Sequence, residues 1–239
     1  MPQPTSTDDT GRDRNFILAA VPDKEYAQMR DRLEPVELGI KDMIYQADEP
    51  IGHVYFPTTA VLSMIAQVDG QAGVEVATIG REGMAGLPVF LGASTSPDLA
   101  FAQIRGRALR MPAGEFRDLA NGAGAIQALL QRYTQAFFVQ LAQGSACNRL
   151  HNLHQRLARW LLMTHDRVGQ DEFLLTQEFM AQMLAVRRAT VTEAAGRLQQ
   201  AGLITYGRGI ITIVDRAGLE AASCECYQII ADEHARLVG

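Results

Sequence analysis

Cysteine is scarce in this sequence. The 239 residues include three cysteines, Cys147, Cys224 and Cys226, and none of them precedes position 147. The N-terminal residues are polar and lack the apolar segment of a secretory signal. An odd number of cysteines without an export signal favours reduced thiols, and we expect a cytoplasmic protein.

Long hydrophobic runs are also missing. No apolar stretch reaches the roughly 18 residues that a membrane-spanning helix needs, so we expect no membrane partner. Hydrophobic residues still make up 47% of the chain, which is enough for a sizeable core. Residues 1–15 are polar, and we expect them to be a disordered lead-in.

Residues 175–214 have the pattern of two short helices followed by a hairpin. Thr176 is a favourable N-cap for the first helix, and residues 185–187 fit a turn before a second helix that begins near Arg188. Gly202 suits the end of that helix, and two β-rich segments then flank residues 207–209. This order predicts a winged helix-turn-helix.

Charge distinguishes this segment from an ordinary helical hairpin, which periodicity alone leaves open. The chain carries a net charge of −5, whereas residues 186–208 contain four arginines and one glutamate. A basic face on an acidic protein is what contact with phosphates requires. The predicted DNA-binding residues are Thr176, Arg187, Arg188, Thr190, Thr192, Glu193, Arg197 and Arg208.

The part of the chain before this segment has a different residue pattern. Residues 16–33 fit a helical segment, and short β-rich runs then alternate with turn signals as far as residue 116. That spacing predicts a small sandwich or barrel of antiparallel strands within a sensor-like domain at residues 16–122.

Residues 123–151 predict one long helix. Apolar residues recur at three-four spacing, and residues 124–150 include two arginines and no acidic residue. We interpret the segment as a dimerisation helix, and the alternative is a core helix packed on its own domain. The expected dimer interface consists of Ile126, Leu130, Tyr133 and Phe137. Residues 152–239 then form the DNA-binding domain, with further helices at residues 153–168 and 217–237.

This order of parts resembles the Crp/Fnr family of bacterial transcription regulators. The resemblance is strongest in LTQEFMAQMLAVRRATVTEAAGRLQQAGLI and looser in GREGMAGLPVFLGASTSPDLAFAQIRGRALRMPAGEF. It implies an α+β fold with an N-terminal antiparallel β-roll like that of cyclic-nucleotide-binding domains, a long dimerisation helix and a C-terminal winged helix-turn-helix. It also implies a homodimer that binds a palindromic operator on double-stranded DNA, with RNA polymerase as a further candidate partner.

The sequence departs from this family at the nucleotide pocket. The corresponding residues are Gly86, Leu87, Asp98 and Leu99. Relatives that bind cyclic AMP pair its phosphate with an arginine, and Asp98 stands at that place. Because an anion buried without a cation is heavily penalised, we expect no response to cyclic AMP. The cysteines are too few for the family's four-cysteine iron–sulfur cluster. Haem, with His53 as a candidate ligand, and a cyclic dinucleotide stay open.

The recognition helix departs from the family as well. The resemblance places the family's base-reading glutamate and arginine at Ala189 and Glu193. Arg188 is well placed to reach base edges, while Arg187, Arg208 and the helix end at Thr176 suit phosphates. Glu193 could accept from cytosine or pair with Arg197 one turn on. We expect the protein to select its own palindrome.

The remaining cysteine and histidine patterns predict no metal site and no catalytic residue. Cys224 and Cys226 are too close for most structural zinc sites without other ligands, and redox sensing or simple packing are the open alternatives. Cys147, His151 and His154 suggest nucleophilic chemistry, but no orienting carboxylate is evident, so we expect no enzyme. The alternative to a DNA-binding regulator is a ligand- or redox-sensing module whose helix-turn-helix contacts proteins.

Overall fold

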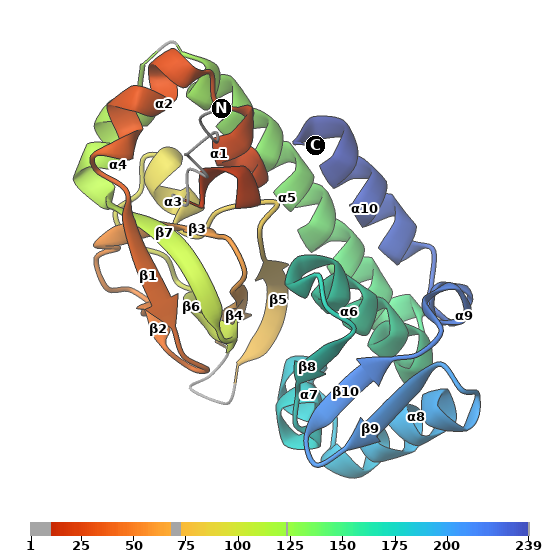
Figure 1. Ribbon diagram of the computed structural model, residues 1–239. Helices are drawn as coiled ribbons and strands as arrows, with labels where there is room; N and C mark the ends of the chain where they lie inside the picture. Colours follow the sequence, from red (N-terminus) through yellow and green to blue (C-terminus); the bar gives the residue numbers. More distant parts are fainter. Residues whose placement is uncertain (1–10, 68–72, 123, 239) are drawn as a thin grey trace, which may run out of the picture.

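The computed structural model describes residues 11–67, 73–122 and 124–238. Figure 1 shows an antiparallel β-roll, the long helix α5 (Ala125–Leu150) and a winged domain near the far end of that helix. The predicted α+β class and the order of parts are confirmed. Within the described residues, no helix is both long and apolar enough to span a membrane.

The N-terminal segment is more ordered than expected. Residues 1–10 of the predicted lead-in lie outside the described residues, but residues 11–15 carry a 3₁₀ turn, η1 (Arg12–Arg14). Asn15 is fully buried, and its side-chain amide donates to the carbonyls of Pro57 and Gly83 at 3.0 and 2.9 Å. The expectation of disorder is therefore wrong for residues 11–15, because a buried amide with two acceptors fixes the chain there.

Two short helices replace the single helical segment expected at residues 16–33. They are α1 (Phe16–Ala20) and α2 (Asp23–Arg30). Pro22 separates them, because proline has no amide hydrogen for the helical ladder and disfavours helical geometry in the residue before it.

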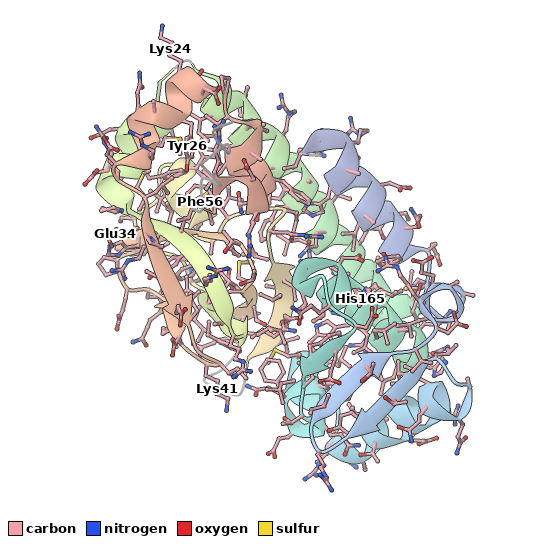
Figure 2. The ribbon with its side chains drawn as sticks, viewed as in Figure 1. Lys24, Tyr26, Glu34, Lys41, Phe56 and His165 are labelled. Atoms are coloured by element: carbon pink, nitrogen blue, oxygen red, sulfur yellow. The ribbon has the colours of Figure 1, made fainter. Side chains whose placement is uncertain are left out.

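Two antiparallel sheets form the roll. One sheet has the order β1 (Glu34–Leu38), β7 (Gly106–Pro112), β3 (His53–Pro57). The other has the order β2 (Met43–Tyr45), β6 (Leu99–Ile104), β4 (Val61–Ala66), β5 (Val74–Ile79). The short helix α3 (Leu87–Phe90) lies between β5 and β6 in the chain, and α4 (Ala113–Ala120) follows β7. Phe56, labelled in Figure 2, is fully buried. Its ring packs edge to face on the ring of Phe116 of α4, with 6.1 Å between the ring centroids.

The C-terminal domain contains helices α6 (Leu153–Val168), α7 (Gln177–Met183) and α8 (Arg188–Gln200). Its sheet has the order β8 (Glu172–Leu174), β10 (Ile210–Ile213), β9 (Ile204–Gly207). Strand β8 adds a third strand to the expected hairpin. The core of this domain includes Val61, Ile65 and Ile104 from the roll, so the winged domain packs directly on its own roll.

The terminal helix expected at residues 217–237 is two helices, α9 (Arg216–Ala222) and α10 (Cys226–Leu237). Ser223 takes an extended backbone conformation and ends α9, which lets the chain turn. Figure 1 shows α10 lying along α5, and His234 Nε2 lies 3.2 Å from Oε1 of Gln140 on that helix.

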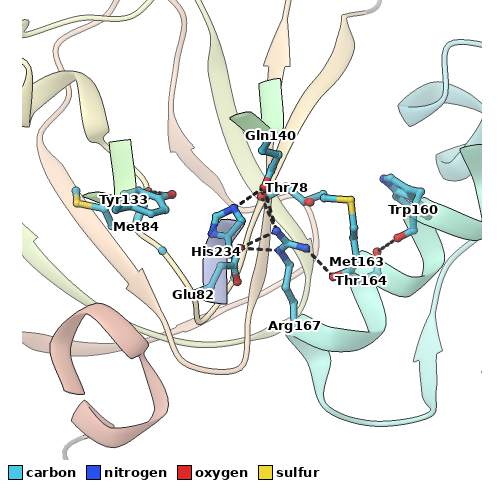
Figure 3. A network of polar contacts seen from close by, with 12 residues as sticks. Thr78, Glu82, Met84, Tyr133, Gln140, Trp160, Met163, Thr164, Arg167 and His234 are labelled. Carbon is cyan, nitrogen blue, oxygen red and sulfur yellow. Dashed lines mark hydrogen bonds and ion pairs between the residues drawn. The ribbon is translucent and has the colours of Figure 1, made fainter. Parts of the chain in front are cut away.

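A buried arginine joins the parts (Figure 3). Arg167 of α6 pairs with Glu82 of the roll at 2.8 Å, and both side chains are nearly inaccessible. Its guanidinium also donates to Oε1 of Gln140 at 3.2 Å and to the carbonyl of Met163 at 2.8 Å. The Arg167 charge holds the pKa of Glu82 below its usual range against the effect of burial. The roll, α5 and α6 are thus joined at the Arg167–Glu82 ion pair and the hydrogen bonds around it.

A second carboxylate links the roll to α6. Glu75 of β5 accepts hydrogen bonds from Ser63 and from the indole of Trp160. Burial raises the pKa of Glu75 from 4.5 to about 7. As pH falls through about 7, the folded chain takes up a proton that the unfolded chain takes up only near 4.5. The contribution of Glu75 to stability is therefore largest at low pH and is lost as pH rises through about 7.

Glu75→Gln removes a charge that the wild type must bury at pH 8. We expect the variant to be more stable than the wild type at pH 8 by roughly 2–3 kcal/mol. The difference should shrink to below about 1 kcal/mol at pH 5 and vanish below about pH 4, where Glu75 is protonated in the folded and the unfolded wild type alike. Urea denaturation at several pH values measures it. Glu37→Gln, at an exposed carboxyl of β1, is the matched control, and a difference independent of pH at position 75 would contradict this account.

Candidate nucleic-acid interface

The first helix of the motif begins as predicted. The Thr176 side chain caps α7 by accepting a hydrogen bond from the Phe179 amide at 3.1 Å. Met180 and Met183 are buried beneath the helix. Thr176 itself is exposed, so the positive end of the α7 dipole lies at the surface, where it favours an anion.

The turn to the second helix depends on one backbone conformation. Ala185 has φ 53°, in the left-handed region, and the Val186 amide donates to the Ala181 carbonyl at 2.9 Å. Helix α8 then starts at Arg188, as the sequence predicts. Its inward face is apolar. The buried residues are Val191, Ala194, Ala195 and Leu198.

The outward face of α8 divides into free and engaged side chains. Arg187, Arg188 and Thr190 are exposed, and neither arginine takes part in an ion pair among the described residues. Thr192, in contrast, donates to Gln177 of α7 or to the Arg188 carbonyl, at 2.8 and 3.0 Å. Thr192 therefore holds the two helices together as well as facing outward.

Glu193 and Arg197 form the ion pair that the sequence allows as an alternative to base reading. Their side chains are about two-thirds exposed and lie 2.7 Å apart, one helical turn from each other. An exposed pair of this kind is worth about 0.3–0.5 kcal/mol. Such a weak interaction leaves both side chains free to exchange partners.

The wing presents Arg208 at its tip. Arg208 and Gly209 have φ 53° and 78°, and Gly207 pairs with Ile210, which defines a two-residue hairpin turn of the I′ type. A left-handed arginine costs about 1–2 kcal/mol relative to glycine. Strain of this kind gathers at functional sites, which directs attention to the exposed Arg208 side chain.

The wing is fastened to the two helices beside it. The Leu175 amide donates to the Gly209 carbonyl at 2.8 Å, and the Gln177 amide donates to the Tyr206 hydroxyl at 3.2 Å. Gln199 of α8 accepts from the Tyr206 amide at 2.9 Å. The start of α7, α8 and the wing therefore form one rigid surface.

The nucleotide-pocket residues of the roll are only partly accessible. Gly86 takes φ 96° at the start of α3, and Leu87 is buried. Leu99 is half-buried on β6. Asp98 is half-buried, burial raises its pKa, and no cation pairs with it among the described residues. His53 of β3 is half-buried, with its ring 6.4 Å from that of Tyr55.

The predicted dimer stripe of α5 lies inside the chain itself. Ile126, Leu130, Tyr133 and Phe137 are all buried and belong to the core of the roll. The Tyr133 hydroxyl donates to the Met84 carbonyl at 3.1 Å. These four residues therefore cannot form a dimer interface, and the alternative of a helix packed on its own domain is correct for this face.

A different face of α5 is open. Its exposed residues alternate at spacings of three and four: Ala128, Gln131, Gln135, Phe138, Ala142, Ser145 and Arg149. This spacing places these side chains along one face of the helix, the seam, which a second helix can contact. Phe138 is 56% exposed, which is unusual for so large an apolar side chain. Apolar periodicity favours the buried stripe over this face, because the buried stripe carries more apolar residues.

The structure brings together cysteines and a histidine that the sequence keeps apart. Cys147 and His151, at the end of α5, meet Cys224 and Cys226, at the start of α10. All three cysteines are buried, and burial raises the pKa of Cys224 and Cys226. This disfavours the reactive, exposed thiolate that a redox sensor needs. His154 is not part of the group.

The chain is similar to known transcription regulators. Residues 155–222 match the family model of the Crp-like helix-turn-helix domain. No curated protein sequence matches the chain.

Three solved structures share the fold over most of their length. FixK2 from Bradyrhizobium japonicum has a TM-score of 0.69 at 17% identity, covering 80% of this chain and 98% of that one. TTHA1359, a CRP/FNR-family transcriptional regulator from Thermus thermophilus, has a TM-score of 0.63 at 18% identity, covering 80% of this chain and 98% of that one. The c-di-GMP responsive global regulator CLP from Xanthomonas campestris has a TM-score of 0.60 at 12% identity, covering 80% of this chain and 99% of that one.

Proposed function

We propose that this chain, which has the fold of Crp/Fnr transcription regulators and a Crp-like helix-turn-helix domain at residues 155–222, is a homodimeric, sequence-specific DNA-binding regulator. The observation that supports this best is the surface of α7, α8 and the wing. Arg187, Arg188 and Arg208 are exposed there without acidic partners among the described residues, on a chain of net charge −5. Such a surface suits phosphates and base edges.

The open seam of α5 supports the homodimer. The seam residues from Ala128 to Ser145 carry no charge, and they are small or amide side chains around Phe138. Arg132, which is also exposed on α5, donates to the Leu237 carbonyl of α10 at 2.9 Å. Two copies packed along this seam would form a symmetric interface, and a two-fold dimer places two recognition helices on two half-sites of a palindrome. RNA polymerase is a further partner that we propose for a regulator bound to such an operator, in the cytoplasm.

The alternative function is a ligand- or redox-sensing module whose helix-turn-helix contacts proteins. In vitro selection from a random duplex pool, with purified protein and no added ligand, separates the two. A regulator enriches one palindrome, and its affinity falls steeply with salt. A protein-contact module enriches no sequence.

Arg188→Ala tests direct reading of the operator. We expect specific affinity to fall by about 1–3 kcal/mol and one base position to relax, because a bidentate contact to a base edge is lost. Repeating the selection with the variant measures both effects. Arg236→Ala, which changes an exposed arginine of α10 that pairs with Glu233, is the control and should leave the selected site unchanged. An Arg188→Ala protein with the wild-type preference would contradict the assignment.

Arg208→Ala tests phosphate contact by the wing. Affinity should fall by a similar factor for every sequence, and the slope of log affinity against log salt should flatten by about one unit. Fluorescence anisotropy at several salt concentrations measures the slope. Loss confined to the selected operator would show instead that Arg208 reads bases.

Phe138→Asp tests the seam. We expect the dimer to dissociate to a folded monomer, because a charge replaces the central apolar contact. Sedimentation at micromolar concentration measures the mass. Leu91→Asp changes a residue of equal exposure, 57% against 56%, on the roll, and should leave the dimer intact. A monomeric wild type would refute the homodimer. Phe137→Asp, at a buried position, should unfold the chain instead.

Cyclic AMP and cyclic GMP should not bind usefully, because Asp98 supplies an anion where a phosphate needs a cation. Calorimetry should give no dissociation constant below about 10 μM, which corresponds to about −7 kcal/mol. A tighter constant would overturn the prediction. A cyclic dinucleotide is the effector to titrate next, since the structurally similar CLP regulator is c-di-GMP responsive. Haem, with His53 as its candidate ligand, is the effector to titrate after that.

A further inference from the structure

Four metal-ligating side chains converge where α5 ends and α10 begins. The Sγ atoms of Cys147, Cys224 and Cys226 and a ring nitrogen of His151 all lie within 4.8 Å of one another. Cys147 Sγ is 3.4 Å from Cys224 Sγ, and Cys226 Sγ is 3.6 Å from His151 Nδ1. The pairs are separated by more than seventy residues in sequence, so the fold creates this group.

The distances fit the edges of a tetrahedron around one ion. With Zn–S bonds of about 2.3 Å, neighbouring sulfurs of a tetrahedral site lie about 3.8 Å apart, and a sulfur and a nitrogen lie slightly closer. An iron–sulfur cluster would hold its ligands around several iron atoms, which requires wider spacing. Three cysteines and one histidine are a usual ligand set for structural zinc.

The surroundings suit the charges of such a site. His151 directs Nδ1 to Cys226, and its Nε2 lies 3.5 Å from a carboxylate oxygen of Glu225. A carboxylate behind a ligating histidine fixes the ring and its tautomer. Three thiolates around a divalent ion carry a net charge of −1.

We propose that Cys147, His151, Cys224 and Cys226 form a closed, four-coordinate site for one divalent cation of the zinc class. The ion would fasten the start of α10 to the end of α5, beside the junction of α5 with α6 that leads into the DNA-binding domain. Binding replaces three S–H bonds by three sulfur–metal bonds and releases three protons to solvent. No oxidant or reductant takes part.

Cobalt substitution is the direct test. Full-length protein purified with reductant and chelator, then titrated with Co²⁺, should bind one equivalent per chain. The complex should show the visible bands of tetrahedral cobalt and the near-ultraviolet bands of thiolate–cobalt charge transfer, and Zn²⁺ should remove both. Cys226→Ser should lose part of the charge-transfer intensity and bind at least tenfold more weakly. Glu37→Gln, which changes an exposed carboxyl of β1, is the control and should bind cobalt as the wild type does.

Glu225→Ala probes the carboxylate behind His151 separately. Its expected effect is about 10–100-fold weaker cobalt binding with an unchanged tetrahedral spectrum, as for other outer-shell partners. Because a substituted ligand can also weaken folding, the melting temperature of each protein is measured with and without chelator. Chelator should lower the melting temperature of the wild type by more than it lowers that of Cys226→Ser.

Three results would overturn the site: no stoichiometric cobalt, a spectrum of octahedral cobalt, or equal binding by Cys226→Ser. A Cys147–Cys224 disulfide in the mass spectrum of protein purified without reductant, together with no metal, would assign the pair to redox chemistry instead. None of these measurements uses DNA, so failure here leaves the proposed DNA binding standing.

Discussion

The buried guanidinium of Arg167 is the constraint on which the placement of the parts depends. A buried cation costs several kcal/mol unless it is paired and its donors are satisfied. Its partners come from three parts of the chain: Glu82 and the Thr78 carbonyl in the roll, Gln140 on α5, and the Met163 carbonyl on α6. Few arrangements of roll, α5 and α6 can satisfy all of them, so this ion pair selects one.

The terminal helix α10 completes the same network. Gln140 Oε1 accepts from Arg167, and His234 Nε2 lies within hydrogen-bond distance of the same oxygen. Burial lowers the pKa of His234 against the opposing effect of the Glu82 charge, which favours the neutral imidazole beside the Arg167 guanidinium. Helix α10 thereby covers one flank of α5. The roll covers another, and the seam around Phe138 is what remains open.

Sequence patterns predicted the local elements well and their partners poorly. Residues 153–168 and the start of α8 at Arg188 followed from helical periodicity and turn chemistry, which are local. The choice of face on α5 failed because periodicity identifies an apolar stripe without saying what covers it. The meeting of Cys147 with Cys224 was beyond any spacing rule, since it depends on α10 folding back along α5. The break at Ser223 that allows this has no strong sequence signal.

The contacts between roll and winged domain also determine how a signal could pass. Helices α5 and α6 are continuous except at His151 and Asn152, so α6 can turn about that junction only if its lateral contacts change. Two of those contacts are carboxylates of the roll, Glu82 on Arg167 and Glu75 on Trp160. Glu75 lies on β5 and is held by a hydrogen bond from Ser63 of the neighbouring strand β4. Glu82 is in the loop after β5. A shift of β5 and the loop after it relative to α6 would change both contacts together. Because α6 shares one hydrophobic core with α8, we expect a change in these contacts to reach α8 as well.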